Sequence, residues 1–199
     1  MSQATLIALY GTKPPAFEEI LNQCFAMIAV VPGIQFKPYS ISQIHATLIG
    51  LEKAGKGDMY NKNIFNFQGR HEAMDVNGFL QYLTCSDLLP LRISIGNYAS
   101  NDARILSRGQ LPYQRSFSIQ GDKVVIMGWP SKRDNRDYGH AATNNAIHRA
   151  GSFHALGLLR KKAEQYNIQH LYHKTDEEFD NDLYIRIGTI DEKAQTKRI

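Results

Sequence analysis

The chain has 199 residues, is 43% hydrophobic and carries a net charge of +4, and no linker rich in Pro, Gly or Ser divides it. A single domain of this length buries about 70% of its unfolded surface, which is enough for a sizeable core. With only two cysteines, the chain is not expected to be a disulfide scaffold. It shows neither the basic and apolar pattern of a secretion signal nor an apolar run of about eighteen residues that could span a membrane. We therefore expect a soluble, cytoplasmic protein without membrane contact.

The first fifty residues predict a strand, a helix and a second strand. Residues 5–10 form a short apolar run that ends at Gly11 and indicates a buried strand. Pro14 and Pro15 are typical of a helix start, and apolar residues recur at three- and four-residue intervals over 17–28. The next strand is expected to run from residue 44 to about residue 51.

The second half of the chain predicts the same order of elements. Residues 52–89 are weakly patterned and indicate loops with short helices, and 91–95 alternate as a strand does. Gly121-Asp122 separates strands over 116–119 and 124–129, which is a hairpin signal. A polar loop, a helix over 147–166 and a strand over 183–190 follow.

The repeated plan predicts an α+β fold with two strand-helix-strand units and antiparallel sheets around a central cleft. We expect a single bilobal domain, with lobe 1 over about 1–55 and lobe 2 over about 121–190. The connecting and central strands occupy about 56–120, and a charged tail covers 191–199.

The segment that carries chemistry is Ile44-His45-Ala46-Thr47-Leu48-Ile49-Gly50. Because side chains alternate along a strand, His45 and Thr47 are expected on one face and the apolar residues on the other. An imidazole and a hydroxyl two residues apart form a compact pair of proton donors and acceptors, suited to an oxyanion. His-x-Thr alone is a common tripeptide, so the remainder of the chain has to support the interpretation.

This combination resembles the 2H phosphoesterase superfamily, which includes the RNA 2′,3′-cyclic phosphodiesterases and related nucleotide phosphodiesterases. The matching residues are the opening strand, Leu6-Ile7-Ala8-Leu9-Tyr10, and the motif strand, His45-Ala46-Thr47-Leu48. The order and lengths of the elements also match over nearly the whole chain. The resemblance implies one strand-helix-strand unit per lobe, with a His-x-Thr or His-x-Ser motif on a strand of each lobe.

The second motif has two candidates. The literal match is His173-Lys174-Thr175, but an acidic run follows it rather than an apolar strand. The positional match lies at the start of the last strand, where Asp182 and Tyr184 replace the histidine and the threonine. Strand geometry favours the positional match, and the sequence leaves both open.

The resemblance implies that one histidine acts as general base and the other as general acid, while the hydroxyls bind the phosphate. His45 and Thr47 form one wall of the site, and either His173 with Thr175 or Asp182 with Tyr184 forms the other. With two histidines no metal is needed, and we expect neither a metal nor a cofactor. With Asp182, a cation such as Arg186 has to offset the repulsion between carboxylate and phosphodiester.

Further contacts to a nucleotide or RNA are expected from aromatic and cationic side chains. The polar loop combines Arg133 with Tyr138 and follows Trp129, a combination that suits base stacking and phosphate binding, although a solvated loop has the same composition. The expected substrate-binding residues are Tyr10, Trp129, Arg133, Tyr138 and Arg186.

The predicted function is therefore a metal-independent phosphodiesterase that hydrolyses cyclic or 2′,5′-linked nucleotide or RNA phosphodiesters as a monomer. One alternative is a non-catalytic nucleotide- or RNA-binding protein on the same scaffold. Another is a structural protein in which His45 is a satisfied core histidine. No P-loop, G-x-G-x-x-G or G-x-S-x-G motif occurs, which argues against ATPases, dinucleotide enzymes and serine hydrolases.

Overall fold

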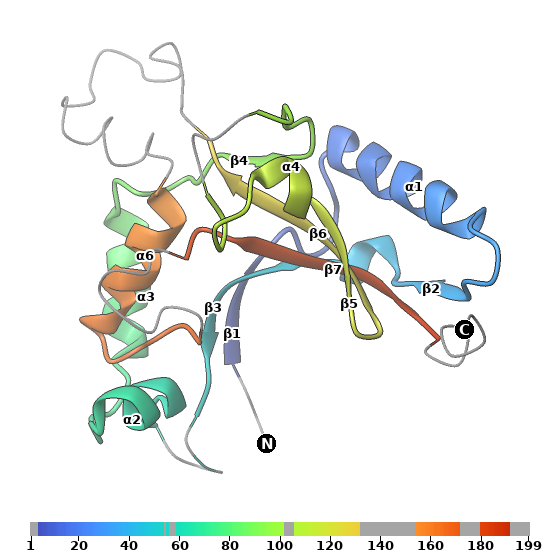
Figure 1. The fold of residues 1–199 in the computed structure, drawn as a ribbon. Helices are drawn as coiled ribbons and strands as arrows, with labels where there is room; N and C mark the ends of the chain where they lie inside the picture. Colours follow the sequence, from blue (N-terminus) through green and yellow to red (C-terminus); the bar gives the residue numbers. More distant parts are fainter. Residues whose placement is uncertain are drawn as a thin grey trace, which may run out of the picture. The chain divides into compact units, whose positions relative to one another are not determined.

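The computed structural model describes residues 4–53, 55, 59–101, 106–131, 154–171 and 180–191. Within these ranges the chain is α+β, as predicted, with five α-helices, a short 3₁₀ helix and a seven-stranded sheet (Figure 1). The elements in chain order are β1 (Ala4–Ala8), α1 (Pro15–Ala29), β2 (Phe36–Pro38), η1 (Ile41–Gln43), β3 (Ala46–Leu51), α2 (Lys62–Gln68), α3 (Val76–Cys85), β4 (Ile93–Ile95), α4 (Pro112–Arg115), β5 (Phe117–Gln120), β6 (Lys123–Pro130), α6 (Ala155–Glu164) and β7 (Leu183–Ile190).

The sheet has the strand order β1-β3-β7-β6-β4, with β2 also paired to β7 and β5 also paired to β6. The pairs β2–β7, β3–β7 and β5–β6 are antiparallel. This agrees with the antiparallel pairing expected from the sequence.

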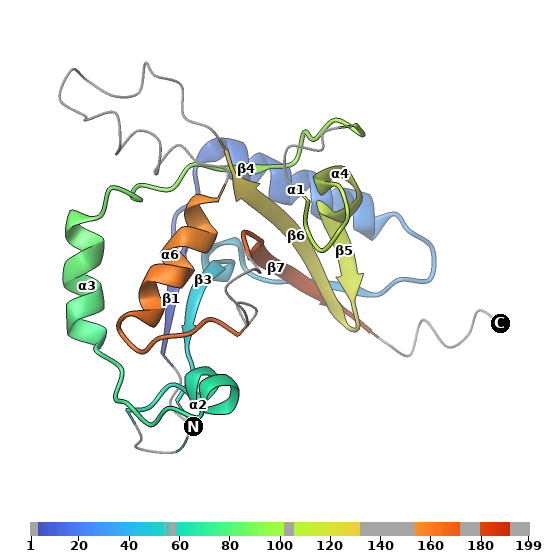
Figure 2. The same ribbon diagram turned by 60° about the vertical axis from the view of Figure 1, so that its left-hand side comes forward.

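Several predicted elements are confirmed. The last strand has the predicted bounds, and α1 begins at Pro15 because the missing N–H of proline costs nothing in the first helical turn. The hairpin β5–β6 turns at the two residues between Gln120 and Lys123, and Gly121 adopts a φ of +62° that favours glycine (Figure 2). The helix expected over 147–166 is observed as α6, and residues 147–153 lie outside the described ranges.

The chain divides into two compact units. Unit 1 comprises residues 1–6, 48–94 and 129–183, and unit 2 comprises 7–47, 95–128 and 184–199. Each unit therefore takes segments from both halves of the chain, whereas the lobes expected from the sequence were nearly continuous. The dividing points fall inside β1, β3, β4, β6 and β7.

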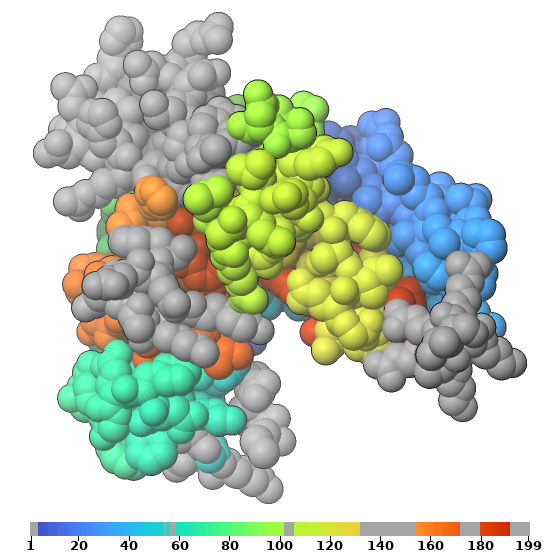
Figure 3. Space-filling view, in the orientation of Figure 1, coloured from blue at the N-terminus to red at the C-terminus, as the bar shows by residue number. Residues whose placement is uncertain are grey.

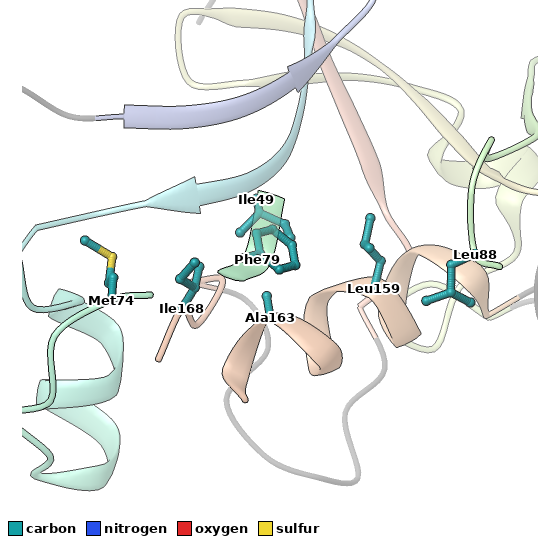
Figure 4. Packing of buried hydrophobic residues seen from close by; sticks show 7 residues of the cluster. All are labelled: Ile49, Met74, Phe79, Leu88, Leu159, Ala163 and Ile168. Atoms are coloured by element: carbon teal, nitrogen blue, oxygen red, sulfur yellow. The ribbon is translucent and has the colours of Figure 1, made fainter. Parts of the chain in front are cut away.

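Unit 1 has a hydrophobic core in which α3 and α6 contribute apolar side chains beside β3. Phe79 of α3, Ile49 of β3 and Leu159 of α6 are all nearly inaccessible to solvent. Figure 4 shows these side chains directed toward one another, with Ala163 and Ile168 close by. The cluster of buried residues is Ile49, Met74, Phe79, Leu88, Leu159, Ala163 and Ile168.

Unit 2 has its own buried side chains. The apolar face of α1 buries Phe17, Leu21 and Ile28, and α1 contacts β2 (Figure 1). Every residue of β6 from Val124 to Gly128 is buried, so this strand is covered on both faces. None of the helices in the described ranges has the length and hydropathy that a bilayer crossing requires.

Candidate functional site

The predicted motif lies at the beginning of β3, in unit 2. His45 separates η1 from β3, and Thr47 is the second residue of the strand. Ile44 and Ala46 are buried, whereas His45 is exposed and Thr47 is half-buried. The expected alternation is therefore confirmed for these four residues. Because His45 is exposed, it is not the buried core histidine that the alternative of a structural protein requires.

The imidazole of His45 is held by a backbone carbonyl. Its Nδ1 lies 2.8 Å from the carbonyl oxygen of Gln43. Because a carbonyl oxygen only accepts hydrogen bonds, Nδ1 carries the hydrogen and donates it. In the neutral ring, Nε2 is then the nitrogen with the lone pair, which is the arrangement that a general base requires.

The antiparallel pairing of β3 with β7 brings further functional groups to the motif. Ala46 pairs with Ile185. Continued by one residue into β3, this register sets Thr47 opposite Tyr184, and Arg186 is the β7 residue next to Ile185 on the side of His45. Directly opposed residues share a face of the sheet and have Cβ atoms about 4.5–5.5 Å apart. Two of the expected site residues on β7 therefore lie beside the motif, within unit 2.

The residues before His45 bulge out of the sheet. Pro38 of β2 pairs with Gly188, and Ala46 of β3 pairs with Ile185. Eight residues of this segment thus correspond to three residues of β7, and the five additional residues include η1. His45 is the last residue of the bulge, which explains why it is exposed although it borders a buried strand.

The turn between β1 and α1 contacts this bulge. The Gly11 N–H donates to the Ser42 carbonyl at 2.9 Å, and the Tyr10 ring centroid lies 6.0 Å from that of His45. Tyr10 is 63% exposed, so its ring forms part of the surface beside the imidazole. Leu9 and Gly11 both have positive φ, of 64° and 79°, which is a sparsely populated conformation for leucine.

Lys13 is a buried cation in the same turn. Only 5% of its surface is exposed, and its Nζ donates to the Gly11 carbonyl at 2.7 Å. Burial lowers the pKa of the Lys13 ammonium, and the carboxylate of Glu18 opposes this shift. No sequence pattern indicates this burial, because a lysine next to two prolines is typical of a solvated loop.

Trp129 and Asp182 form a pair inside unit 1. The indole Nε1–H of Trp129 donates to Asp182 Oδ1 at 2.7 Å, and the exposed fraction of Trp129 is 0%. A fully buried ring has no face on which a base can stack, so the expectation that Trp129 contacts the substrate is not met in this structure. The Asp182 carboxylate, expected as a replacement for the second histidine, here accepts a hydrogen bond from a core residue.

A network of buried polar groups surrounds this pair, and the sequence did not indicate it. Arg160, 1% exposed, donates to the carbonyls of Leu48, Asp180 and Asp182 at 2.9, 2.8 and 3.2 Å. Its Nη1 also lies 3.0 Å from the Asp180 carboxylate. Burial lowers the pKa of the Arg160 guanidinium, and the carboxylates of Asp180 and Asp182 oppose this shift. A guanidinium remains charged in this setting, so the network is held by a permanent cation.

The other candidate residues lie outside the described residues. They are the literal second motif, His173 with Thr175, and the loop residues Arg133 and Tyr138. The histidine that the structure does describe near this segment is His170, which is buried. Its Nδ1 accepts from the Gly50 N–H at 3.3 Å, a structural role within unit 1.

In the described ranges, no three His, Cys, Asp or Glu side chains gather in a way that suits a metal ion. The groups that unit 2 brings together are a histidine with a defined tautomer, two hydroxyls and a guanidinium. Comparison with protein-family models, curated proteins and solved structures found no match to this chain.

Proposed function

We propose that the protein is a metal-independent phosphodiesterase of the 2H type that hydrolyses cyclic or 2′,5′-linked nucleotide or RNA phosphodiesters. The observation that supports the proposal most is the hydrogen bond from His45 Nδ1 to the Gln43 carbonyl. This bond leaves Nε2 as the basic nitrogen on an exposed side chain. Metal-independent hydrolysis requires such a base.

In the proposed reaction, His45 Nε2 removes a proton from the attacking water while the water oxygen bonds to phosphorus. The hydroxyl of Thr47 and the guanidinium of Arg186 hold the phosphoryl oxygens, and Arg186 offsets their negative charge. The leaving oxygen takes a proton from a general acid. The resemblance implies that the second motif supplies it, and this motif is His173 with Thr175 in the literal match or Asp182 with Tyr184 in the positional match. General base and general acid each contribute about 10²–10⁴-fold to such a rate.

The proposal is tested with a panel of 2′,3′-cyclic nucleotides and short RNAs. The variant His45→Gln keeps a polar side chain but removes the basic nitrogen, so we expect its kcat/KM to fall by about 10²-fold or more. His71→Gln is the matched control, because His71 is an exposed histidine of unit 1 that contacts the rings of Tyr60 and Phe65. Equal activity of wild type and His45→Gln would remove His45 from the mechanism.

A second candidate, a nucleotide- or RNA-binding protein without turnover, is favoured by one observation. At the strand position where the resemblance expects the second histidine, the Asp182 carboxylate is bonded to the buried Trp129. This candidate predicts thermal stabilisation by a nucleotide without product formation, worth about 2.7 kcal/mol at a ligand concentration of 100 Kd. If neither nucleotides nor RNA raise Tm, binding on this scaffold is excluded along with turnover.

A further inference from the structure

The outer edge of β5, in unit 2, offers backbone groups to a further strand. The Met127 N–H donates to the Ser116 carbonyl at 3.0 Å, and Phe117 pairs with Ile126. Because hydrogen-bonded and non-hydrogen-bonded pairs alternate in an antiparallel ladder, Ser118 is bonded to β6 and its two neighbours are not. The N–H and C=O groups of Phe117 and Ile119 therefore point away from β6.

The side chains of the same two residues are exposed. Phe117 is 43% exposed and Ile119 is 42% exposed, and they lie on one face of the strand. Helix α4 lies beside β5 (Figure 2). Its residue Tyr113 is 58% exposed. In Figure 3 the atoms of α4 and β5 lie on the visible surface, coloured green to yellow.

This edge lacks three of the features that normally prevent strands from pairing between molecules. Besides being short, as β5 is, edge strands in monomers commonly carry a charged side chain, a proline or a bulge. From Phe117 to Gln120, β5 has none of these, and its register with β6 is regular. An apolar and unprotected edge favours pairing with another extended chain.

The edge is complementary to itself. An antiparallel copy centred on Ser118 sets Phe117 opposite Ile119 of the second copy, and Ile119 opposite Phe117. The two outward-facing residues on each side then exchange N–H···O=C bonds as two hydrogen-bonded pairs, which gives four bonds in total. In the same register each exposed phenylalanine lies against an isoleucine, an aromatic–β-branched pair that stabilises antiparallel sheets.

We propose that the protein forms a twofold-symmetric dimer in which the β5 edges of two copies pair antiparallel about Ser118. Strand β5 has four residues and this register pairs three of them, so the interface is small compared with the roughly 1,000 Å² that a stable complex buries. The dimer accordingly dissociates on dilution. The proposal is independent of the phosphodiesterase proposal, because its tests need no substrate.

The first test measures the mass of the full chain by sedimentation velocity over a wide range of concentrations. The wild type is expected to shift from monomer to dimer as concentration rises. Ile119→Lys sets a lysine against the phenylalanine of the second copy, and this variant is expected to remain monomeric. Met27→Lys is the control, since Met27 of α1 is 71% exposed and lies outside β5. Far-UV circular dichroism verifies that both variants fold.

The second test uses the symmetry of the register. In a background with Cys24→Ala and Cys85→Ser, Ser118→Cys sets two thiols across the twofold axis. There the Cα atoms of a non-hydrogen-bonded pair are about 4.5 Å apart, within the range of a disulfide. Mild oxidation is expected to produce a covalent dimer of Ser118→Cys but not of Gln120→Cys, which is two residues from the axis.

A wild type that remains monomeric at every concentration overturns the proposal and leaves the β5 edge to a strand of a different protein. Cross-linking of Gln120→Cys as efficient as that of Ser118→Cys overturns the register. A dimer that survives Ile119→Lys but is lost in Met27→Lys assigns the contact to α1 and also overturns it.

Discussion

At the scale of single residues, Arg160 shows how a buried charge determines the neighbourhood of a candidate site. Its guanidinium bonds to three backbone carbonyls and one carboxylate, which join β3, α6 and residues 180–182 of unit 1. The planar fork of an arginine reaches several acceptors at once, whereas a lysine presents a single point charge. The network therefore depends on arginine in particular.

This dependence predicts that Arg160→Lys is strongly destabilising. The shorter donor leaves carbonyl groups and the Asp180 carboxylate without their partner in a buried setting, and breaking a buried ion pair costs about 3–5 kcal/mol. Urea denaturation measures the free energy of unfolding. Arg70→Lys is the matched control, because the Arg70–Glu72 pair is 39% and 59% exposed and solvent screens the attraction between the two charges. Equal effects of the two substitutions would contradict the structural role of Arg160.

The burial of Lys13 predicts how the free energy of unfolding depends on pH. Because burial lowers its pKa in the folded protein, the unfolded chain binds more protons between that lowered value and the ordinary 10.5. The free energy of unfolding contributed by Lys13 therefore rises with pH across this window. We expect the stability of wild type relative to Lys13→Met to increase as pH approaches 10.5, measured by urea denaturation at several pH values. Lys37→Met, at an exposed position of β2, is the control for removing a lysine. A difference that does not change with pH would show that Lys13 is not desolvated.

At the scale of elements, the sequence predicted those whose periodicity is undisturbed. Helix α1 has apolar residues at helical spacing, and β7 alternates from Leu183 to Gly188, so the predictions of both elements were correct. Strand β2 was missed because three residues ending in a proline carry no detectable period. The bulge before His45 was missed for a related reason, since it is defined by the register of β2 and β3 on β7.

The candidate site was predictable only in part. The faces of His45 and Thr47 follow from alternation along the chain, whereas the positions of Tyr184 and Arg186 beside them depend on pairing between strands distant in sequence. The role of Trp129 was not predictable, because a tryptophan next to a basic loop reads equally well as a base-stacking platform or as a core residue. Its bond to Asp182 appears only in three dimensions.

The close contact between β2 and β7 predicts that replacing Gly188 by a larger residue lowers the stability of the fold. A Cβ at this position would lie 2.5 Å from the Phe36 ring and 2.6 Å from the Lys37 carbonyl oxygen. A backbone oxygen cannot move without separating the two strands, so Gly188→Ala is expected to cost about 1–3 kcal/mol of stability. Gly50→Ala is the matched control, because a Cβ there comes no closer than 3.6 Å to its neighbours. Thermal unfolding of both variants measures the difference, and an unchanged Tm for Gly188→Ala would contradict the close approach.

At the scale of the whole molecule, the chain builds each unit from three separate segments. No single cut in the sequence releases one unit intact, because the dividing points lie within strands. Stability therefore has to be assigned with reporters inside each unit rather than with truncated chains. The chain offers such a reporter in Trp129, its single tryptophan, which is buried in unit 1.

The fluorescence emission of Trp129 can report how a cavity in the core of unit 1 affects stability. Leu159 is 0% exposed and belongs to the cluster drawn in Figure 4, so Leu159→Ala removes buried methyl groups and leaves a cavity. Such substitutions cost about 2–5 kcal/mol. We expect the red shift of tryptophan emission, which marks exposure of Trp129, to occur at lower urea concentration with an unchanged m-value. Leu80→Ala is the matched control, because Leu80 lies on α3 of the same unit but is 49% exposed. Its substitution is expected to change the free energy of unfolding by about 0.5 kcal/mol or less. If Leu159→Ala left the midpoint of the emission change where it is in the wild type, the core of unit 1 would not be the structure that buries Trp129.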